Sequence, residues 1–546
     1  MTATTAGDRH GELRSLARGG ALNLVGAGLS GAANLGLTVV VARVFSKYDA
    51  GVFFSATSLF LILLAAADLG TSTGLVYFIA RFRALGTTGR IPGMLRTAFV
   101  PLLATSLVLA GLLYGLAPWL ADWLVAGDSV SGVRDLRILA VFLPFATLSQ
   151  ACLAGTQGFR VMRATVLVEK LARPSLQLLL VVAAGLLGGG AVLLPLAWAG
   201  PYLPAAVAAA AWLAVLAYRT AKNGGETDRI VSAGVEEDGR SADAEAVNGG
   251  HTKALRVGGS EEARSPGPAR TPGFWRFTGP RALAGVAQIA IQRLDIVLVS
   301  ALRGPVEAAV YTAATRFLVV GQLAAQALNQ AVQPRLSELL ARGDTEGAAG
   351  VYQTSTAWLV VLTWPLYLLA ASFSWFVLAI FGKGYDTGAP VMIILSLAML
   401  VATACGMVDI VLTMAGKTTW NLYNYLAALV VNVVVNVIAI PPLGILGAAI
   451  GWAVALLVKN LLPLTQIWVT LRLHPFSRAS LTACGLALVG FGAIPLAVRL
   501  LFGDGIVPLA AATLAGLVCY AAGLWRARYL LHLDAMPILG RIVRTR

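Results

Sequence analysis

Stretches of mostly apolar residues, each long enough to cross a bilayer, follow one another along almost the whole chain. A helix of ~20 such residues spans a hydrocarbon core of ~30 Å. Of the 546 residues, 58% are hydrophobic and only 12% are charged, which is too little charge to cover a soluble protein of this size. We therefore predict an all-α polytopic membrane protein.

About fourteen spans are predicted from the length and hydrophobicity of these stretches. They lie approximately at 19–42, 50–80, 95–118, 136–158, 164–187, 191–218, 278–302, 308–332, 354–381, 388–414, 420–441, 444–470, 479–501 and 506–526. No signal peptide is visible, because the first apolar stretch is too long for one and lacks a clear cleavage site.

A polar interruption divides the chain. Residues 219–275 are rich in Gly, Ala, Glu, Arg and Pro and show no periodicity, which predicts a disordered cytoplasmic linker. The linker is either a tether or a regulatory segment. The predicted units are an N-terminal lobe at 1–218 with spans 1–6, the linker at 219–275, a C-terminal lobe at 276–472 with spans 7–12, and spans 13–14 with a basic cytoplasmic tail at 473–546.

An internal repeat supports this division. Residues 49–57 read DAGVFFSAT and residues 307–315 read EAAVYTAAT, and each stretch opens the second span of its half. Two homologous six-helix lobes are therefore expected, with spans 13 and 14 as additions. Repeated lobes around a central cavity are typical of transporters.

The net charge of +15 does not indicate nucleic acid, because the basic residues lie mainly between apolar stretches, where they set topology and meet lipid headgroups. With a cytoplasmic N-terminus, the outward side carries seven basic residues and the inward side more than twice as many. The seven are Arg43, Lys47, Arg134, Arg137, Arg303, Lys383 and Arg499. The positive-inside rule then predicts a cytoplasmic-membrane protein with both termini in the cytoplasm.

Two nucleotide-binding patterns are excluded. Gly26, Gly28 and Gly31 match G-x-G-x-x-G but lie inside an apolar span, without the preceding strand that a dinucleotide site needs. The Gly416-Lys417-Thr418 stretch lacks the first glycine of a P-loop. We expect instead that Gly28, Ala32 and Gly36 form a small-residue face on which a neighbouring helix packs.

The region 42–81, ARVFSKYDAGVFFSATSLFLILLAAADLGTSTGLVYFIAR, resembles the start of the bacterial polysaccharide transporters, in the multidrug/oligosaccharidyl-lipid/polysaccharide exporter superfamily. Its recognisable parts are Arg43, Asp49-Ala50-Gly51, Asp68-Leu69-Gly70 and Phe78-Ile79-Ala80-Arg81. The stretches 293–317 and 333–344 are similar to that family's seventh and eighth spans. The likeness covers spans 1–12 in order.

This resemblance implies a V-shaped alternating-access flippase that moves a lipid-linked oligosaccharide or polysaccharide precursor to the outer leaflet. It also implies glycosyltransferases and a polymerase of the same pathway as partners, besides membrane lipids. The alternative is a multidrug/cation antiporter of the same superfamily. An enzyme is not expected, because the outward loops are short and only four His occur. No cofactor or metal site is predicted, since the four Cys lie in apolar segments without C-x-x-C spacing.

Ionisable residues within spans are costly and favour cavity positions. An anionic head group would be attracted by Arg or Lys in a water-filled cavity. Arg293, Arg316 and Lys459 lie deepest in their spans and are the first candidates to bind substrate. The other candidates are Lys170, Arg173, Asp68 and Asp295, and further ionisable residues in the spans are Glu169 and Asp409.

Internal pairing is the alternative for these residues. Arg293 and Asp295 are two apart, so on a helix they point about 160° from each other and each needs another partner or water. Lys170 and Arg173 share a face and lie near the cytoplasmic end, where they reach either headgroups or substrate.

Polar amides line one face of span 8. Gln322, Gln326, Asn329 and Gln333 fall within about 60° of arc, so they either bind sugar hydroxyls or contact a neighbouring helix. Asn432 and Asn436 in span 11 leave the same two possibilities open.

Overall fold

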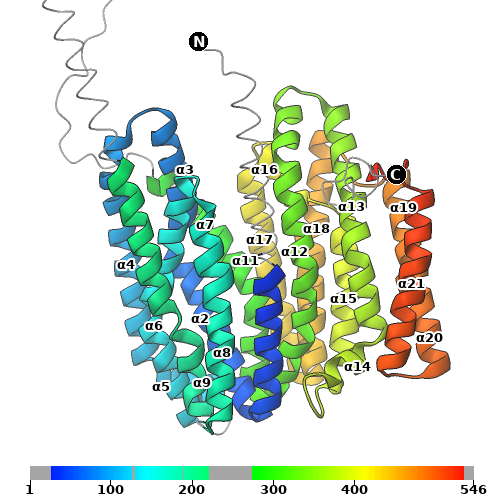
Figure 1. Ribbon diagram of the computed structural model, residues 1–546, viewed down its shortest axis with the longest axis horizontal. Helices are drawn as coiled ribbons and strands as arrows, with labels where there is room; N and C mark the ends of the chain where they lie inside the picture. The colour runs from blue at the N-terminus through cyan, green and yellow to red at the C-terminus, as the bar shows by residue number, and fades with distance from the viewer. Residues whose placement is uncertain (1–25, 27, 126–128, 189, 221–273, 534–546) are drawn as a thin grey trace, which may run out of the picture.

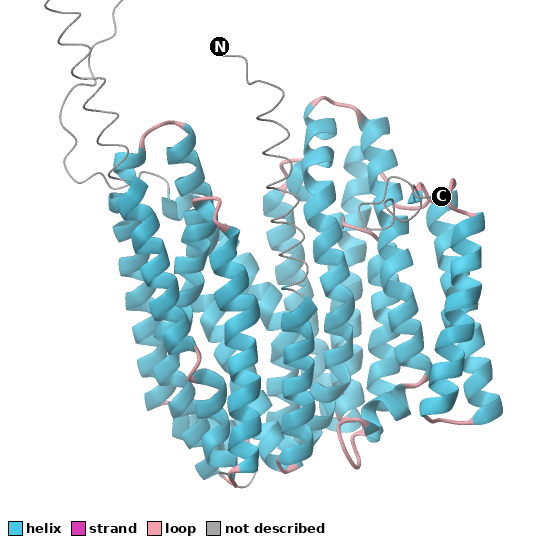
Figure 2. Cartoon of the chain, viewed as in Figure 1, coloured by secondary structure: helices cyan, strands magenta, loops and turns pink. Residues whose placement is uncertain are grey.

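The structure is a computed structural model that describes residues 26, 28–125, 129–188, 190–220 and 274–533. These residues form helices and loops, without a strand among them (Figure 2). Most of the predicted linker, the polar N-terminal segment and the basic tail lie outside the described residues.

The first half contains eight labelled helices preceded by the helix Gly28–Val44. They are α2 (Lys47–Asp68), α3 (Thr71–Ala84), α4 (Ile91–Gly115), α5 (Ala117–Leu124), α6 (Ser129–Gly158), α7 (Met162–Ala164), α8 (Arg173–Leu186) and α9 (Gly190–Ala199), and the span begun by α9 continues to Thr220.

The second half begins with α11. Its helices are α11 (Phe274–Arg303), α12 (Pro305–Ala341), α13 (Thr345–Ser372), α14 (Ser374–Ala379), α15 (Ala389–Ala404), α16 (Val408–Met414), α17 (Thr418–Leu443), α18 (Ile445–Leu471), α19 (Arg478–Ala487), α20 (Ile494–Phe502) and α21 (Ile506–Arg526).

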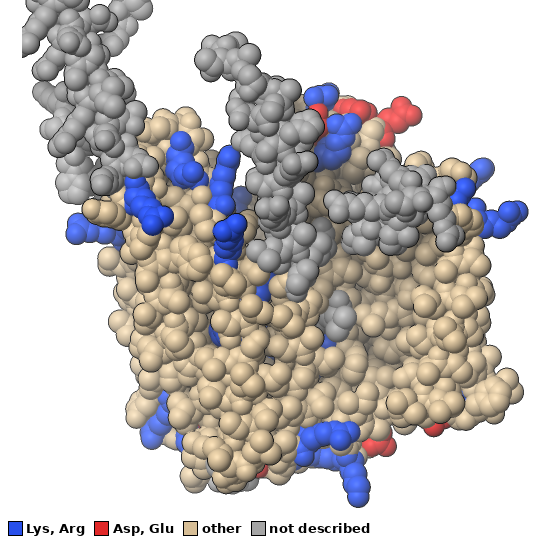
Figure 3. Space-filling view, viewed as in Figure 1, with Lys and Arg blue, Asp and Glu red and all other residues tan. Residues whose placement is uncertain are grey.

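Twelve described helical segments are long and apolar enough to cross a membrane. The apolar helix Gly28–Val44 and the segment from Met162 to Leu186 lie beside them, so the predicted fourteen-helix, all-α membrane fold is confirmed. Apolar side chains cover the sides of the bundle, while most of the visible charged side chains gather at its two ends (Figure 3). Such a belt matches the hydrocarbon layer of a bilayer.

The second span is broken, where the sequence predicts a continuous helix over 50–80. Leu69 and Gly70 adopt left-handed backbone angles, with φ of 50° and 69°, between α2 and α3. The Asp68 carboxylate, two residues before the N-cap Gly70, accepts hydrogen bonds from the Ser72 backbone N–H and hydroxyl, so it satisfies a free N–H in the first turn of the restarted helix. Gly70 also lies against α11, since a Cβ there would be 2.6 Å from the Thr278 carbonyl oxygen.

Two spans contain a π-helical segment, each with a proline two residues after its end. Residues Thr165–Ala172 precede Pro174, and residues Leu488–Ala493 precede Pro495. Proline cannot donate to the carbonyl four residues earlier and its ring clashes with it, so the preceding turn widens. The widened turn changes which face each later side chain occupies.

The two halves lie side by side, with α19, α20 and α21 at the outer edge of the second half (Figure 1). We call the end that carries Thr220, Phe274 and the turns at 85–90, 342–344 and 472–477 the linker end. The opposite end carries the turns at 45–46, 380–388, 444 and 503–505.

The two copies of the sequence repeat meet at the opposite end. A Cβ on Gly51 of α2 would lie 1.8 Å from the carbonyl oxygen of Pro305, the first residue of α12. Nearby, the Ser300 hydroxyl of α11 donates to the Leu124 carbonyl of α5 at 2.8 Å. The halves therefore join backbone against backbone at this end.

The predicted packing face of the first helix is largely wrong. Gly28 and Ala32 are exposed, and nothing lies within 4 Å of a Cβ built on Gly28, while Gly36 makes only an ordinary contact with Leu178. The close contact is instead at Gly31, the residue before Ala32, where a Cβ would be 2.8 Å from Leu323 of α12. Small residues permit close packing but do not fix which of them is used.

Candidate functional site

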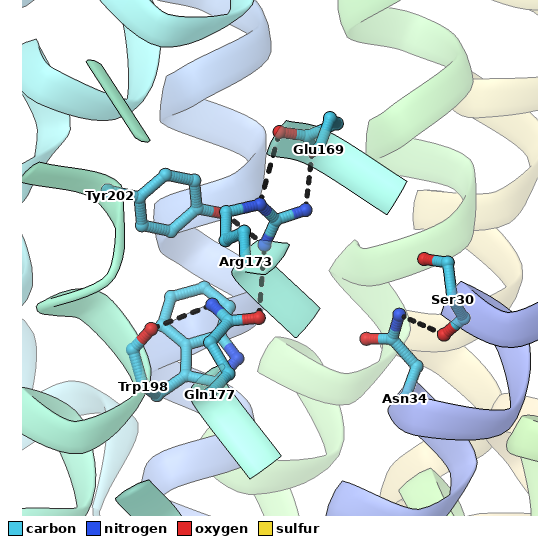
Figure 4. Close-up of polar contacts among 7 residues, drawn as sticks. All are labelled: Ser30, Asn34, Glu169, Arg173, Gln177, Trp198 and Tyr202. Carbon is cyan, nitrogen blue, oxygen red and sulfur yellow. Dashed lines mark hydrogen bonds and ion pairs between the residues drawn. The ribbon is translucent and has the colours of Figure 1, made fainter. Parts of the chain in front are cut away.

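Arg173 is the centre of a polar network in the first half (Figure 4). Its guanidinium donates to both carboxylate oxygens of Glu169 and, at 3.1 Å, to Gln177 Oε1. It also lies over the Tyr202 ring, 4.9 Å from the centroid. The Gln177 amide donates onward to the Trp198 carbonyl at 2.7 Å. Arg173 therefore has a full set of partners, and these partners join α8 to the last span of the half.

A cavity of about 690 Å³, lined by both apolar and polar side chains, adjoins this network through Glu169. Its walls come from α3, α6, the π-helical segment and the start of α11. The polar lining residues are Ser72, Thr73, Tyr77, Gln150, Gln157, Thr165, Glu169 and Arg281. Ser72 is already bonded to Asp68, Gln157 to Thr165 and Glu169 to Arg173, so a ligand rich in hydroxyl groups would share these side chains with their internal partners.

Arg293 and Arg316 differ from Arg173, because they have no ion pair with any described carboxylate. Arg316 Nε is buried and has no hydrogen-bond partner among the described residues. The two guanidinium groups are close enough to repel one another electrostatically. Arg293 also interacts with Tyr202, so the pair lies next to the Arg173 network.

Asp295 is the carboxylate nearest to this pair but it is already bonded. It is 1% exposed, accepts a short hydrogen bond from the Tyr311 hydroxyl and accepts another from the Ile296 backbone N–H at 3.0 Å. As the spacing predicts, Arg293 and Asp295 form no ion pair, and Asp295 uses another partner. Asp295 still attracts both arginines electrostatically, so two guanidinium groups and one carboxylate leave a net positive charge for a ligand or water to balance.

Lys459 lies in a separate cluster of the second half. Its Nζ is 3.7 Å from Asp409 Oδ2 and 5.0 Å from the Tyr425 ring centroid. Tyr425 donates to the same carboxylate oxygen at 2.9 Å. Lys459 thus has a carboxylate partner, unlike the two arginines with which it is grouped from sequence.

Two other predicted site residues have clear local roles. Asp68 bonds to Ser72 in the first turn of α3, as described above, and Ser72 lines the cavity. The stem of Lys170 packs beside the first helix, 3.3 Å from a Cβ built on Gly26.

The amide face of α12 remains available for binding. Gln322 and Asn329 are half-buried and Gln326 is exposed, and none of the three has a hydrogen bond within the described part of the chain. The Asn329 Oδ1 atom is buried without a partner. This arrangement leaves the predicted sugar-binding role open.

Asn432 and Asn436 are fully buried instead. Asn436 Nδ2 donates to Asn432 Oδ1 at 3.2 Å, and a Cβ on Gly451 of α18 would lie 2.0 Å from Asn436 Oδ1. These amides therefore contact the neighbouring helix, which favours the helix-packing role over the sugar-binding role that the sequence also left open.

Several polar residues near the network are not among the site residues that the sequence predicts. Gln177, Tyr202 and Gln150 lie in apolar stretches without a repeating polar pattern. Asn34 of the first helix points toward the side of the network that carries Gln177, and its amide donates to the Ser30 carbonyl at 2.9 Å (Figure 4). The only sequence signal is that an amide in a span tends to avoid lipid.

No group of three or more His, Cys, Asp or Glu side chains that could hold a metal ion occurs in the described ranges.

Comparisons with known proteins identify the fold. Residues 280–438 match the MatE family model. No curated protein matches the sequence. Three solved structures are similar. The lipid II flippase MurJ in an inward closed conformation has a TM-score of 0.65 at 14% identity, covering 93% of this chain and 99% of MurJ.

The other two are multidrug resistance MATE family transporters of the MOP superfamily. The inward-facing conformation has a TM-score of 0.59 at 15% identity, covering 81% of this chain and 94% of that one. The outward-facing conformation has a TM-score of 0.52 at 16% identity, covering 83% and 95%. This chain thus has the fold that MurJ and the MATE transporters share, and those proteins are transporters. The narrower likeness to polysaccharide transporters stays a prediction.

Proposed function

We propose that this chain is an alternating-access flippase for a lipid-linked oligosaccharide or polysaccharide precursor with an anionic head group. The observation that carries the proposal is that the neighbouring Arg293 and Arg316 form no ion pair with a described carboxylate. In addition, Arg316 Nε is buried without a hydrogen-bond partner. A buried charge without a partner costs several kcal/mol. Such a cost is offset when a phosphate or pyrophosphate group binds between the two guanidinium groups, which suit bidentate contacts with phosphate.

The surroundings of the arginine pair favour a sugar-bearing substrate. The cavity beside Glu169 is lined in part by amides and hydroxyls, and Gln322, Gln326 and Asn329 have amides without a hydrogen bond among the described residues. The cationic centre would hold the phosphate while these groups hydrogen-bond sugar hydroxyls. The apolar tail of the substrate would remain in the lipid, alongside the exposed Leu and Val side chains of the bundle.

The contacts between the halves fit one state of a transport cycle. The Gly51–Pro305 and Ser300–Leu124 contacts join the halves at the opposite end. The two inward conformations among the similar structures have higher TM-scores than the outward-facing one. In our proposal the protein is closed at the opposite end and receives substrate from the linker end.

We infer the location from the basic residues. Their excess at the linker end supports a cytoplasmic membrane protein with the linker and both termini in the cytoplasm. Glycosyltransferases and a polymerase that make and use the lipid-linked sugar are the proposed partners.

A multidrug/cation antiporter is the second candidate. The MatE match and the carboxylates Glu169 and Asp409 within spans favour it, because such a transporter exchanges cations at intramembrane carboxylates. Both carboxylates have basic partners in this chain, at 2.5 Å for Glu169 and 3.7 Å for Asp409, which weighs against a free cation site.

Reconstitution separates the two candidates. Purified protein in proteoliposomes receives either a fluorescent lipid-linked pyrophosphoryl oligosaccharide or a cationic dye with an imposed proton or sodium gradient. We expect leaflet exchange of the lipid-linked sugar and no gradient-driven dye movement. Dye transport without exchange of the lipid-linked sugar would establish the antiporter instead.

A further inference from the structure

A second basic pocket lies at the opposite end of the bundle, away from the arginine pair. It encloses about 560 Å³ and is lined by Arg43, Lys47, Lys383, Tyr385 and Asp386, among others. Arg43 and Lys47 lie at the junction of the first helix with α2, whereas residues 379–386 follow α14 in the second half. The pocket therefore has one wall in each half.

The basic residues of this pocket lack the partners that others at the same end have. Arg134, Arg303 and Arg499 each pair with a carboxylate, at 2.9, 3.1 and 3.0 Å. In the described part of the chain, Arg43, Lys47 and Lys383 have no carboxylate within 4.0 Å, although Asp386 is on the pocket wall. Basic residues are few at this end. Of those without an ion pair among the described residues, Arg43, Lys47 and Lys383 converge on one pocket, whereas Arg137 lies elsewhere, over the Tyr114 ring.

Local geometry holds the pocket open. Arg43 Nε donates to the Ile380 carbonyl at 2.6 Å, which ties the two halves together and leaves the rest of the guanidinium for a ligand. Lys47 Nζ lies 5.5 Å from the Tyr385 ring centroid. Gly384 has a φ of +75°, which favours glycine, and Lys47 Nζ lies close by, 2.3 Å from a Cβ built on this residue.

The tyrosine provides a further polar group. Tyr385 is 1% exposed and lines the pocket, and its hydroxyl has no hydrogen-bond partner among the described residues. A buried hydroxyl without a partner is unfavourable unless a ligand or water satisfies it. Three cations against the single Asp386 carboxylate leave the pocket with a net positive charge, which matches a phosphate-bearing group.

We propose that this pocket binds a phosphoryl anion and so bridges the two halves at the opposite end. The anion is either a soluble phosphate compound or the head group of an anionic phospholipid. A ligand that contacts both walls binds the closed arrangement better than a separated one, so it shifts the population toward closure at this end. The inference concerns binding at a second place and does not depend on the transported substrate.

The test is equilibrium binding of radiolabelled inorganic pyrophosphate to full-length protein in phosphatidylcholine nanodiscs. Arg293→Gln and Arg316→Gln are present throughout, so that the central arginines cannot contribute. We expect saturable binding that weakens about tenfold or more when Lys47→Gln and Lys383→Gln are added. This pair of changes keeps the Arg43–Ile380 hydrogen bond, and a thermal unfolding curve checks that the protein is folded.

The matched control is Arg303→Gln with Arg499→Gln, which removes two paired arginines from the same end and should leave binding unchanged. Nanodiscs with phosphatidylglycerol distinguish the sources of the anion. Weaker pyrophosphate binding in them identifies the lipid head group as a competing occupant, and unchanged binding identifies a soluble anion. Equal binding by the parent and the Lys47/Lys383 variant, or no saturable binding in phosphatidylcholine, would overturn the proposal.

Discussion

Gly51 of α2 and Pro305 of α12 touch through their backbones, at a distance that leaves no room for a side chain on Gly51. The two residues open the corresponding spans of the two halves, so the sequence repeat is also the place where the halves join. Such a contact closes one end of the bundle only while residue 51 remains glycine.

Gly51→Val should therefore separate the halves at the opposite end. The new side chain would overlap the Pro305 carbonyl, and backbone atoms cannot move aside without moving α12. Spin labels at the exposed positions Val130 and Leu443, in a background without Cys484 and Cys519, report the separation by pulsed electron resonance. We expect longer distances than in the parent.

Gly111→Val is the control for this substitution, because nothing lies within 4 Å of a Cβ at that position of α4. The control should leave the distance distribution unchanged. Identical distributions for Gly51→Val and the parent would show that the Gly51–Pro305 contact does not hold the halves together.

Two arginine substitutions should change stability in opposite directions. Arg173→Met leaves Glu169 without its partner and should cost about 3 kcal/mol, because a half-buried charge is left unpaired. Arg316→Met removes a half-buried guanidinium group whose Nε is buried without a partner, and should stabilise the protein by about 1 kcal/mol. Thermal unfolding in nanodiscs measures both. A loss of stability in Arg316→Met would indicate that its guanidinium has a partner after all.

Asp68→Ala should lower stability by about 1 kcal/mol, the usual cost of losing an N-terminal cap. Asp68→Asn keeps an oxygen acceptor for Ser72 and should have a smaller effect. If Asp68 acts only as a cap, the initial transport rate per folded protein is unchanged in both variants. A rate that falls in Asp68→Asn while stability is kept would instead assign the carboxylate to the substrate path.

The Lys459–Asp409 pair can be examined by a double-mutant cycle. Both side chains are partly exposed, at 20% and 35%, so the coupling should be about 0.5–1 kcal/mol. We expect Lys459→Met to reduce transport and Lys459→Met with Asp409→Asn to restore it, because the pair then has no unbalanced charge. Failure of the double variant to restore transport would favour direct substrate contact by Lys459.

The sequence predicts the spans well because hydrophobic length is a local property. The fourteen spans follow from it, and the polar cap at Ser46 and Asp49 begins α2 three residues before the predicted start. The break at Leu69–Gly70 also has a local cause, the hydrogen bond between Asp68 and Ser72. Hydrophobic length alone does not predict this break, because apolar residues continue on both sides of it. The π-helical segments before Pro174 and Pro495 are hidden for the same reason.

Which side chains meet is far less predictable. Gly31, and not Gly28, packs closely because of where α12 lies. Asn436 is buried against a neighbouring helix because Gly451 of α18 leaves room for its amide. Likewise, Lys459 and Arg316 are equivalent by depth in their spans, yet only Lys459 has a carboxylate opposite it. Depth is readable from the sequence, whereas the partner across the bundle is set by tertiary packing.

The most direct test of the account is the initial rate of leaflet exchange of a lipid-linked pyrophosphoryl oligosaccharide by Arg293→Gln/Arg316→Gln in proteoliposomes. Arg303→Gln, which removes an arginine already paired with Glu307, is the matched control. We predict that the double variant folds, inserts and loses about tenfold or more of the parent's rate, while the control keeps it. A double variant that exchanges the lipid at the parent's rate would contradict a cationic centre that binds the substrate head group.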